Sequence, residues 1–370
     1  MKNILFALIL LIFASCNQNQ SNKTCYYPVP DEVTMLTEDN MPKVETFTLE
    51  KIHLPSKYLN SYYYVYDDSL VIILNNSNPD PYIISVYNLN TQQEIAGYFK
   101  KGNGPNEFMS LSGYFHKNNL LLQDGNLHAL TQLNIDSIIL KGNNYIPKIT
   151  YHDAQVMTDF VFLGNDTIVS ANGMFIKGFG VDNVSEFELY DANTGKALQK
   201  YPQNEKNFPP NAVYRTITYS NSKFVVFWSL FPVISIYDKN FNIIKQYRDA
   251  KFKDCLLTIQ EEEFNNIKSV DDFLLYFTFG CETDNFIVAS NYRYNIKREM
   301  INPQSNIDFS KDYEMWIFDT DMNLKRRLKS KNFVKENIWF VSYCESSNNF
   351  YLNCEDENGE LALFKCILKK

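Results

Sequence analysis

The sequence predicts an all-β fold, and more specifically a six-bladed β-propeller. Aromatic residues make up 15% of the chain, and such enrichment favours strands over helices. Long helical patterns are nearly absent, and the best candidate is the short polar segment 258–269. A unit of three or four strands recurs at roughly 50 to 60 residues, a period typical of propeller blades. Because one such sheet cannot bury both faces alone, we expect the units to close into a ring.

Each unit contains an apolar strand, a turn, a second strand ending in an aromatic residue, an Asn- or Asp-rich turn, and a third strand. Clear copies are Asp68–Leu74 with Tyr82–Tyr87, and Ser222–Phe227 with Val233–Tyr237. Equivalent starts lie near residues 70, 120, 168, 224, 286 and 350. The second unit is the weakest, since the strand after Leu120–Asp124 is short. Turn residues of this kind separate strands.

The two ends of the predicted ring are expected to meet. Residues 44–52 alternate like a strand, whereas the last unit ends with residues 361–368 and lacks a fourth strand. An isolated N-terminal strand would leave two unprotected sheet edges. We therefore predict that residues 44–52 pair with 361–368 and close the last blade.

The N-terminus has the layout of an export signal. Lys2 precedes an apolar run from Ile4 to Ala14, and small residues lead to Cys16. This run is too short for a stable membrane span. We predict a signal peptide at 1–15, lipidated Cys16 with a tether at 16–42, and the propeller at 43–370. The alternative is an ordinary signal peptide with an incidental cysteine. The predicted location is the outer membrane, with the periplasmic side favoured because no acidic run follows Cys16.

Charge and cysteine content exclude several functions. The net charge is -8 and no basic patch stands out, which argues against nucleic acid as a partner. Besides Cys16 there are six cysteines, which leaves disulfides and buried thiols open as alternatives. Neither the cysteines nor the four scattered histidines have a metal-binding spacing, so no metal and no cofactor is predicted.

A glycine-rich segment, KGNGPNEF at residues 101–108, connects the first two units. Gly102 and Gly104 permit unusual backbone conformations, and Pro105 restricts the next turn. Glu107 is placed to accept hydrogen bonds from backbone N–H groups. Two interpretations follow: a ligand-binding loop at the mouth of the central channel, or a linker between blades whose glutamate fixes its own backbone. The second is favoured, because turns recruit these residues for shape.

Together with the lipobox-like Cys16 and the repeat, this GxGPxEF segment resembles the TolB-like six-bladed β-propeller lipoproteins of Gram-negative bacteria. The resemblance covers nearly the whole chain after the signal. It implies an envelope-anchored domain and gives no activity.

Residues 292–313 form the longest predicted connection within a unit. Tyr292, Arg293 and Tyr294 begin it, and a connection of this length exceeds a simple hairpin. Long loops on a rigid scaffold often carry recognition. These three residues are therefore the predicted ligand-facing element.

Carboxylates give no clear catalytic pattern. The pair Asp67-Asp68 falls at a turn, Asp271-Asp272 does so too, and Glu261–Glu263 lies on the polar helix candidate. Adjacent strand residues point to opposite faces and cannot converge on one substrate. We therefore predict no catalytic residue and an envelope-anchored module that binds a protein, peptide or glycan. The alternatives are a hydrolase or lyase acting on glycans at the channel, or a structural partner of a larger envelope complex.

Overall fold

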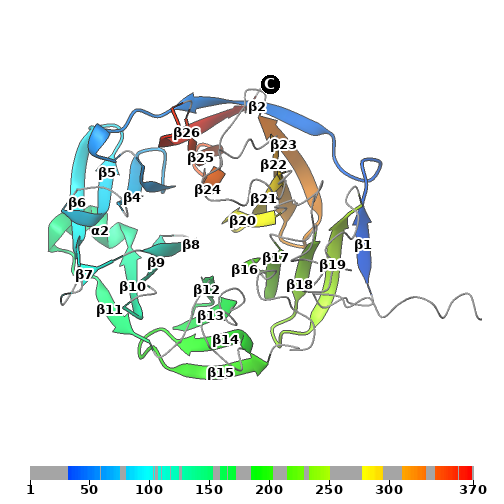
Figure 1. Cartoon of the computed structure of the whole chain (residues 1–370), viewed down its shortest axis with the longest axis horizontal. Helices are drawn as coiled ribbons and strands as arrows, with labels where there is room; N and C mark the ends of the chain where they lie inside the picture. Colours follow the sequence, from blue (N-terminus) through cyan, green and yellow to red (C-terminus); the bar gives the residue numbers. More distant parts are fainter. Residues whose placement is uncertain are drawn as a thin grey trace, which may run out of the picture.

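The strands of the protein form sheets that stand around a central axis, which is a propeller-type arrangement (Figure 1). The computed structural model describes residues 32–58, 60–75, 81–102, 104, 107–109, 111–116, 118–124, 127–152, 159–164, 166–171, 185–202, 215–228, 233–250, 277–294, 311–330, 338–356 and 358–368. The all-β class predicted from the sequence is confirmed.

Three sheets follow one another along the first half of the chain. In each sheet the first strand lies nearest the inside of the ring and the later strands follow in order toward its rim (Figure 1). The first sheet contains β3 (Tyr62–Val65), β4 (Leu70–Leu74), β5 (Tyr82–Asn88), β6 (Gln93–Lys101) and the short parallel strand β7 (Glu107–Phe108). The second contains β8 (Ser112–His116), β9 (Asn119–Asp124), β10 (Ala129–Asn134) and β11 (Lys148–Tyr151). The third contains β12 (Phe160–Phe162), β13 (Thr167–Ala171), β14 (Ser185–Asp191) and β15 (Ala197–Pro202).

The second half of the chain forms a fourth sheet and one sheet of eight strands. The fourth contains β16 (Arg215–Ser220), β17 (Lys223–Trp228), β18 (Val233–Tyr237), β19 (Ile243–Asp249) and β1 (Val33–Leu36). The eight-stranded sheet runs in space through β20 (Phe277–Glu282), β21 (Phe286–Tyr294), β22 (Lys311–Asp319), β23 (Leu324–Ser330), β2 (Val44–Lys51), β26 (Leu361–Leu368), β25 (Asn349–Glu355) and β24 (Ile338–Cys344).

Residues 33–51, here called the N-terminal arm, run along the rim and join strands from different sheets (Figure 1). The predicted pairing of residues 44–52 with 361–368 is present, since Phe47 faces Leu368 and Lys51 faces Phe364. Strand β2 also pairs in parallel with β23, and β1 pairs in parallel with β19, neither of which was predicted. Strand β1 therefore lies within the predicted tether 16–42, and its buried Leu36 packs in a core cluster with Tyr247 of β19.

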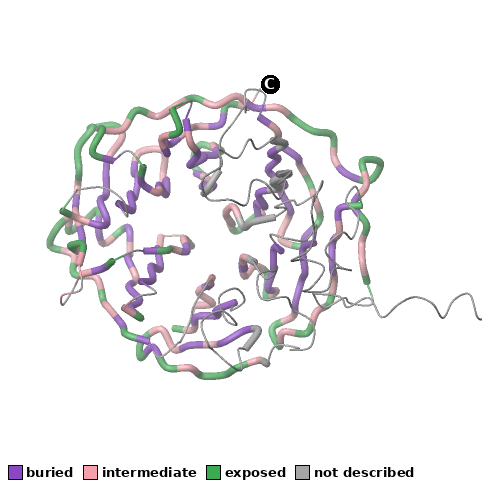
Figure 2. Tube along the Cα trace, viewed as in Figure 1, coloured by how far each residue is buried: buried purple, intermediate pink, exposed green. Residues whose placement is uncertain are grey.

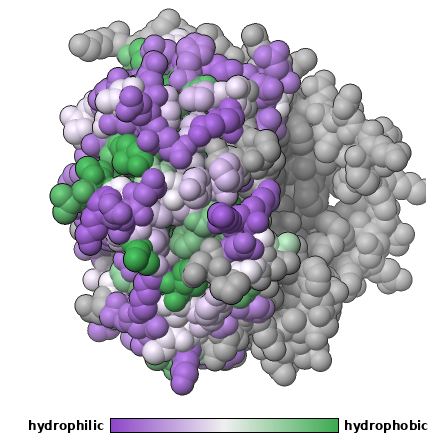
Figure 3. All heavy atoms as spheres, turned by 90° about the vertical axis from the view of Figure 1, so that its left-hand side faces the viewer, coloured by the Kyte–Doolittle hydropathy of each residue, from purple (hydrophilic) through white to green (hydrophobic). Residues whose placement is uncertain are grey.

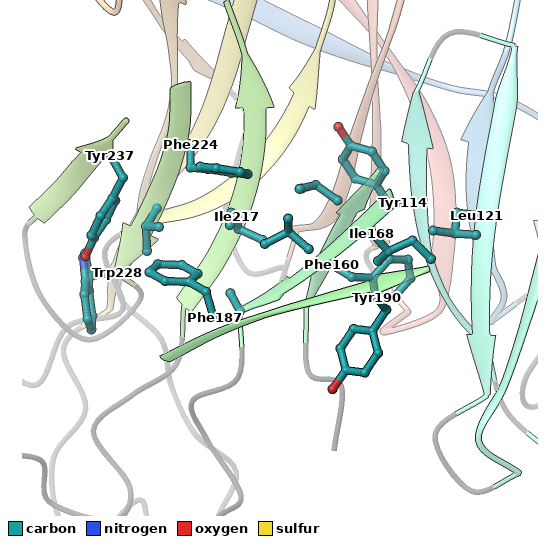
Figure 4. Close-up of a cluster of buried hydrophobic side chains, with 14 of the residues drawn as sticks. Tyr114, Leu121, Phe160, Ile168, Phe187, Tyr190, Ile217, Phe224, Trp228 and Tyr237 are labelled. Atoms are coloured by element: carbon teal, nitrogen blue, oxygen red, sulfur yellow. The ribbon is translucent and has the colours of Figure 1, made fainter. Parts of the chain in front are cut away.

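Apolar residues fill the spaces between neighbouring sheets. All five residues of β4 are buried, as expected for a strand covered on both faces. Figure 2 shows buried residues concentrated within the sheets and exposed residues along the rim. In the cluster shared by the second, third and fourth sheets, the rings of Phe187 and Phe224 lie with Trp228 and Tyr237 (Figure 4). Packing between sheets therefore explains the high aromatic content.

One helical insertion was missed by the sequence prediction. Helix α2 (Ile135–Lys141) and the 3-10 turn η2 (Gly142–Asn144) connect β10 to β11, and a second 3-10 turn, η1 (Ser56–Tyr58), precedes β3. Asn134 is the N-cap of α2, and its Oδ1 accepts the Ser137 N–H at 2.9 Å. The predicted helix 258–269 lies outside the described residues. Among the described residues, no helix is long and apolar enough to span a membrane.

The described cysteines are thiols, which was one of the two alternatives left by the sequence. Cys281, Cys344, Cys354 and Cys366 are all free, and the last three are buried. Burial raises the pKa of the Cys366 thiol well above its usual value and keeps it protonated. Cys16, Cys25 and Cys255 lie outside the described residues.

Candidate functional site

The alternating direction of the strands gives the ring two different ends. Connections from first to second and from third to fourth strands emerge at one end, and the remaining connections at the other. At the first end, β5 passes to β6 and β22 to β23 within a few residues. At the second end, Tyr294 must connect to Lys311, and Asp249 to Phe277. We call these the short-turn end and the long-connection end.

The short-turn end is built from repeated, self-contained turns. Oδ1 of Asp191 accepts the N–H groups of Asn193 and Thr194 at 2.8 and 2.7 Å. Oδ1 of Asp238 accepts those of Asn240 and Asn242 at 2.8 and 2.9 Å. Equivalent bonds are made by Asn88 and Asp319.

These bonds leave little acceptor capacity for a ligand. The backbone N–H of Thr194 lowers the pKa of Asp191, and the Asn242 side chain lowers that of Asp238. Both carboxylates are therefore ionised and already bonded within their own turns. The repeated aspartates at this end thus hold the shape of their own turns.

The predicted glycine-rich segment lies at the long-connection end, between β6 and β8. Oε2 of Glu107 accepts the Gly104 N–H at 2.8 Å, and Gly102 N–H donates to Phe108 O at 3.0 Å. A Cβ on Gly102 would lie 2.1 Å from Glu107 Oε2, and one on Gly104 would lie 2.9 Å from it. Both glycines are thus needed for Glu107 to fold back over its own loop. Pro105 lies outside the described residues.

The residues at the end of this loop contact both the first and the second sheet. Phe108 is buried and its ring lies 4.5 Å from that of Phe99. The buried carboxylate of Asp124 accepts the Met109 N–H at 2.5 Å and the Leu127 N–H at 3.2 Å. These bonds join the described residues of the loop to one another and to β9, and both interpretations of the loop, as a linker and as a ligand-binding element, stay predictions.

The other predicted element, Tyr292–Tyr294, also lies at the long-connection end. These residues are the last three of β21, and their backbones pair with Lys311–Tyr313 of β22. Their side chains, and residues 295–310, lie outside what the structure describes. The structure therefore brings the two predicted elements to the same end of the ring but to different sheets, since β7 and β21 lie apart around it (Figure 1).

One carboxyl group that the sequence did not single out lies at this end. Asp159 directly precedes β12, the innermost strand of the third sheet, and its Oδ2 accepts the Ile217 N–H of β16 at 2.6 Å. It therefore links the third and fourth sheets near the inside of the ring. Burial raises the pKa of Asp159 to about 7, and N–H bonds from Ile217 and Phe160 oppose this effect. A carboxyl with this pKa exchanges its proton near neutral pH.

A tyrosine makes the corresponding link between the first and second sheets. The hydroxyl of Tyr64, on β3, donates to Gly113 O of β8 at 3.1 Å. Burial raises the pKa of Tyr64, and the carboxyl of Asp159 raises it further, so the two groups lie close enough to interact. No residue pattern in the sequence marks this pairing, because it depends on contacts between three sheets.

The histidines are less scattered than their sequence positions suggest. The rings of His128 and His152 lie 5.5 Å apart, and His152 N–H donates to His128 O at 2.8 Å. No group of three or more metal-ligating side chains occurs among the described residues. The pair Asp67-Asp68, in the β3–β4 turn of the first sheet, has structural partners: Asp67 Oδ1 accepts the Leu70 N–H, and the Tyr351 hydroxyl donates to Asp68 from the neighbouring sheet.

Comparison with known proteins shows similarity of fold. No protein-family model matches the chain, and no curated protein matches it. A member of the DUF4221 family from Bacteroides vulgatus has 12% identity and a TM-score of 0.57, with 89% of this chain and 98% of that chain covered. A predicted exported protein of Bacteroides fragilis has 11% identity and a TM-score of 0.55, with 91% and 100% covered. At these identities the similarity shows a shared fold over nearly the whole chain.

Proposed function

We propose that the chain is a six-bladed, TolB-like β-propeller lipoprotein of the cell envelope that binds a protein, peptide or glycan at its long-connection end. The blades are the first four sheets and the two halves of the eight-stranded sheet, β20–β23 and β24–β26 with β2. In this scheme β2 completes the last blade. The lipid on Cys16 holds the protein at the outer membrane, on its periplasmic side.

The difference between the two ends carries the binding proposal. At the short-turn end the Asx side chains of four turns are bonded to their own backbones. The long-connection end instead carries the segment 101–108, Tyr292–Tyr294 and Asp159. Binding residues concentrate on loops held by a rigid scaffold, and the two longest connections, from Asp249 to Phe277 and from Tyr294 to Lys311, lie at this end.

A binding screen with matched variants tests this assignment. We expect the purified chain to retain one class of ligand on glycan and peptide arrays. Arg293→Ala, at the long-connection end, should weaken that binding, whereas Lys239→Ala, in an exposed turn of the short-turn end, should not. Binding that depends on Lys239 and not on Arg293 would contradict the proposal.

Lipid anchoring has its own test. Cells grown with radiolabelled palmitate should label the wild-type chain and leave Cys16→Ala unlabelled. Label on the variant, or none on the wild type, would show that Cys16 is not the site of lipidation.

A hydrolase or lyase acting on glycans is the second candidate function, and Asp159 is the observation that favours it. A carboxyl with a pKa of about 7 near the inside of the ring is suited to proton transfer at neutral pH. In this scheme Asp159 acts as the general acid or base. Release of reducing ends from envelope polysaccharides by the wild-type chain, lost in Asp159→Asn, would support the enzyme over the binding module.

A further inference from the structure

The second sheet breaks the pattern of the short-turn end. In the first, third and fourth sheets the third strand reaches the fourth through a polar Asx turn. In the second sheet the same connection is α2 followed by η2 and extends from Asn134 to Lys148. A sequence that departs from its own repeat at one position is a place to look for a function.

The insertion is fixed firmly against the first sheet. The Gly97 N–H of β6 donates to Asn143 Oδ1 at 2.9 Å, and the Tyr98 hydroxyl donates to Gly142 O at 2.8 Å. The ring of Tyr145 meets that of Tyr98 edge-on at 6.0 Å. Ile135 and Ile138 are buried below α2. The outer surface of the insertion is therefore held in a defined orientation.

That outer surface is apolar. Ile139, Leu140 and Ile146 are 47%, 83% and 87% exposed, and the last two have the highest exposures among the large hydrophobic residues described. The side of the molecule that carries α2 displays hydrophobic side chains among hydrophilic ones (Figure 3). Lys141 and Lys148 are exposed next to them in the chain, and Lys148 Nζ also donates to Asn193 Oδ1 of the neighbouring turn at 2.6 Å. Aliphatic side chains with neighbouring lysines are the composition of segments that dock at a lipid–water interface.

We propose that Ile139, Leu140 and Ile146 dock on the bilayer to which the chain is anchored, with Lys141 and Lys148 contacting anionic headgroups. This inference rests on the proposed lipid anchor at Cys16. It assigns the short-turn end to the membrane side and leaves the long-connection end facing away from the membrane, toward ligands.

The position of the N-terminal arm supports this orientation. Glu32 O accepts the Gln246 N–H at 3.1 Å, and its carboxylate lies 3.5 Å from Lys245 Nζ. The chain thus enters β1 beside the start of β19, which follows a turn of the short-turn end. Sixteen peptide bonds separate Cys16 from Glu32, which allows a reach of up to roughly 55 Å. The anchor and the apolar insertion can therefore meet the same bilayer.

Tryptophan scanning on the full-length lipidated protein in vesicles tests the proposal. The vesicles contain phosphatidylethanolamine and phosphatidylglycerol, with or without brominated acyl chains. The added indole emission of Leu140→Trp should fall by about half or more with brominated lipid, since docked side chains reach the acyl boundary. Met109→Trp is the matched control, because Met109 is a 43% exposed residue that follows β7 at the long-connection end, and its emission should be quenched by iodide and not by brominated lipid.

The outcomes separate the docking surface from the anchor. If the protein floats with the vesicles but Leu140→Trp is quenched only by iodide, the proposed docking of the insertion on the bilayer is wrong, whereas the lipid anchor is supported. If the protein does not float with the vesicles, both the lipid anchor and the docking of the insertion on the bilayer are wrong. Equal quenching of both variants by brominated lipid would also overturn the proposal, because the contact would not be specific to the insertion.

Discussion

Equivalent strands at the rim of the ring differ in whether another strand covers their outer edge. Gln246 on β19 and Arg327 on β23 occupy the same position after the turn between the third and fourth strands, and Lys200 occupies it on β15. Beneath the N-terminal arm, Gln246 and Arg327 are 1% and 2% exposed. The Lys200 side chain is 62% exposed, and no described strand pairs with the outer edge of β15. One half of the rim is thus covered by the arm, and β15 is not.

The two segments of the arm that pair with β19 and β23 have the same residue pattern. Val33 faces Gln246 and Leu36 faces Asp249, while Val44 faces Arg327 and Phe47 faces Ser330. In each case a valine begins the parallel pairing and a buried apolar residue ends it three positions later. An outer edge strand exposes unpaired backbone groups, which invites pairing with other chains. The arm removes that liability from β19, β23 and β26.

The largest expected effect comes from the buried ion pair under the arm. Arg327 donates from Nε to Glu314 Oε2 at 2.9 Å, while its Nη1 reaches Glu38 of the arm at 2.8 Å. Arg327→Ala leaves the carboxylate of Glu314 buried without its counter-charge and should cost about 3–5 kcal/mol of unfolding free energy. The neighbouring pair, Arg326 with Glu45, is more exposed, so Arg326→Ala should cost no more than about 1 kcal/mol. Urea unfolding of both variants measures the difference, and equal losses would contradict it.

The next effect compares an aliphatic side chain of the arm with one on the open edge. Leu36 of β1 is 5% exposed within a core cluster, whereas Leu198 of β15 is 58% exposed. Leu36→Ala should lower the unfolding free energy by about 3 kcal/mol, and Leu198→Ala by less than about 0.5 kcal/mol. If thermal and urea unfolding showed no loss for Leu36→Ala, the arm would not contribute to the stability of the fourth sheet.

The contribution of Asp159, which links the uncovered third sheet to the covered fourth sheet, to the unfolding free energy should depend on pH. Because folding raises the pKa of Asp159 to about 7, the folded state favours the neutral carboxyl. That contribution is complete below about pH 4, the pKa of an unfolded aspartate, and is lost as the pH rises through 7. Asp159→Asn cannot ionise, so its stability relative to the wild type should increase by about 2 kcal/mol between pH 5 and pH 8. Parallel stability curves for the two proteins would show that folding does not shift the pKa of this carboxyl.

Sequence patterns predicted the parts of this fold that repeat. The apolar strands and Asx turns were located closely: predicted 233–237 is β18, and predicted 82–87 lies within β5. The parallel additions of β1 and β2 were missed because a four-residue segment such as Val33–Leu36 carries no period of its own. Helix α2 was missed because it replaces a turn, and the η2 turn that follows it is held by bonds to β6 of another sheet.

The site could be predicted less well than the fold. The sequence placed Gly102, Gly104 and Glu107 in one loop, and the glutamate does bind that loop. The role of Asp159 depends on the position of Ile217 in another sheet, and neither residue has a local signature. The role of such a side chain depends on residues in neighbouring sheets, and the spacing of residues along one strand does not show which residues these are.

The smallest expected effect concerns how β15 remains unpaired. On β19 the Gln246 N–H points to the arm, so the N–H of Arg248, two residues later, points the same way. Pro202 occupies the equivalent place on β15, two residues after Lys200, and proline has no N–H to offer. Pro202→Val should change the unfolding free energy by less than about 0.5 kcal/mol while increasing self-association, measured by light scattering against protein concentration. Unchanged self-association would show that exposed polar side chains such as Lys200 protect this edge without the proline.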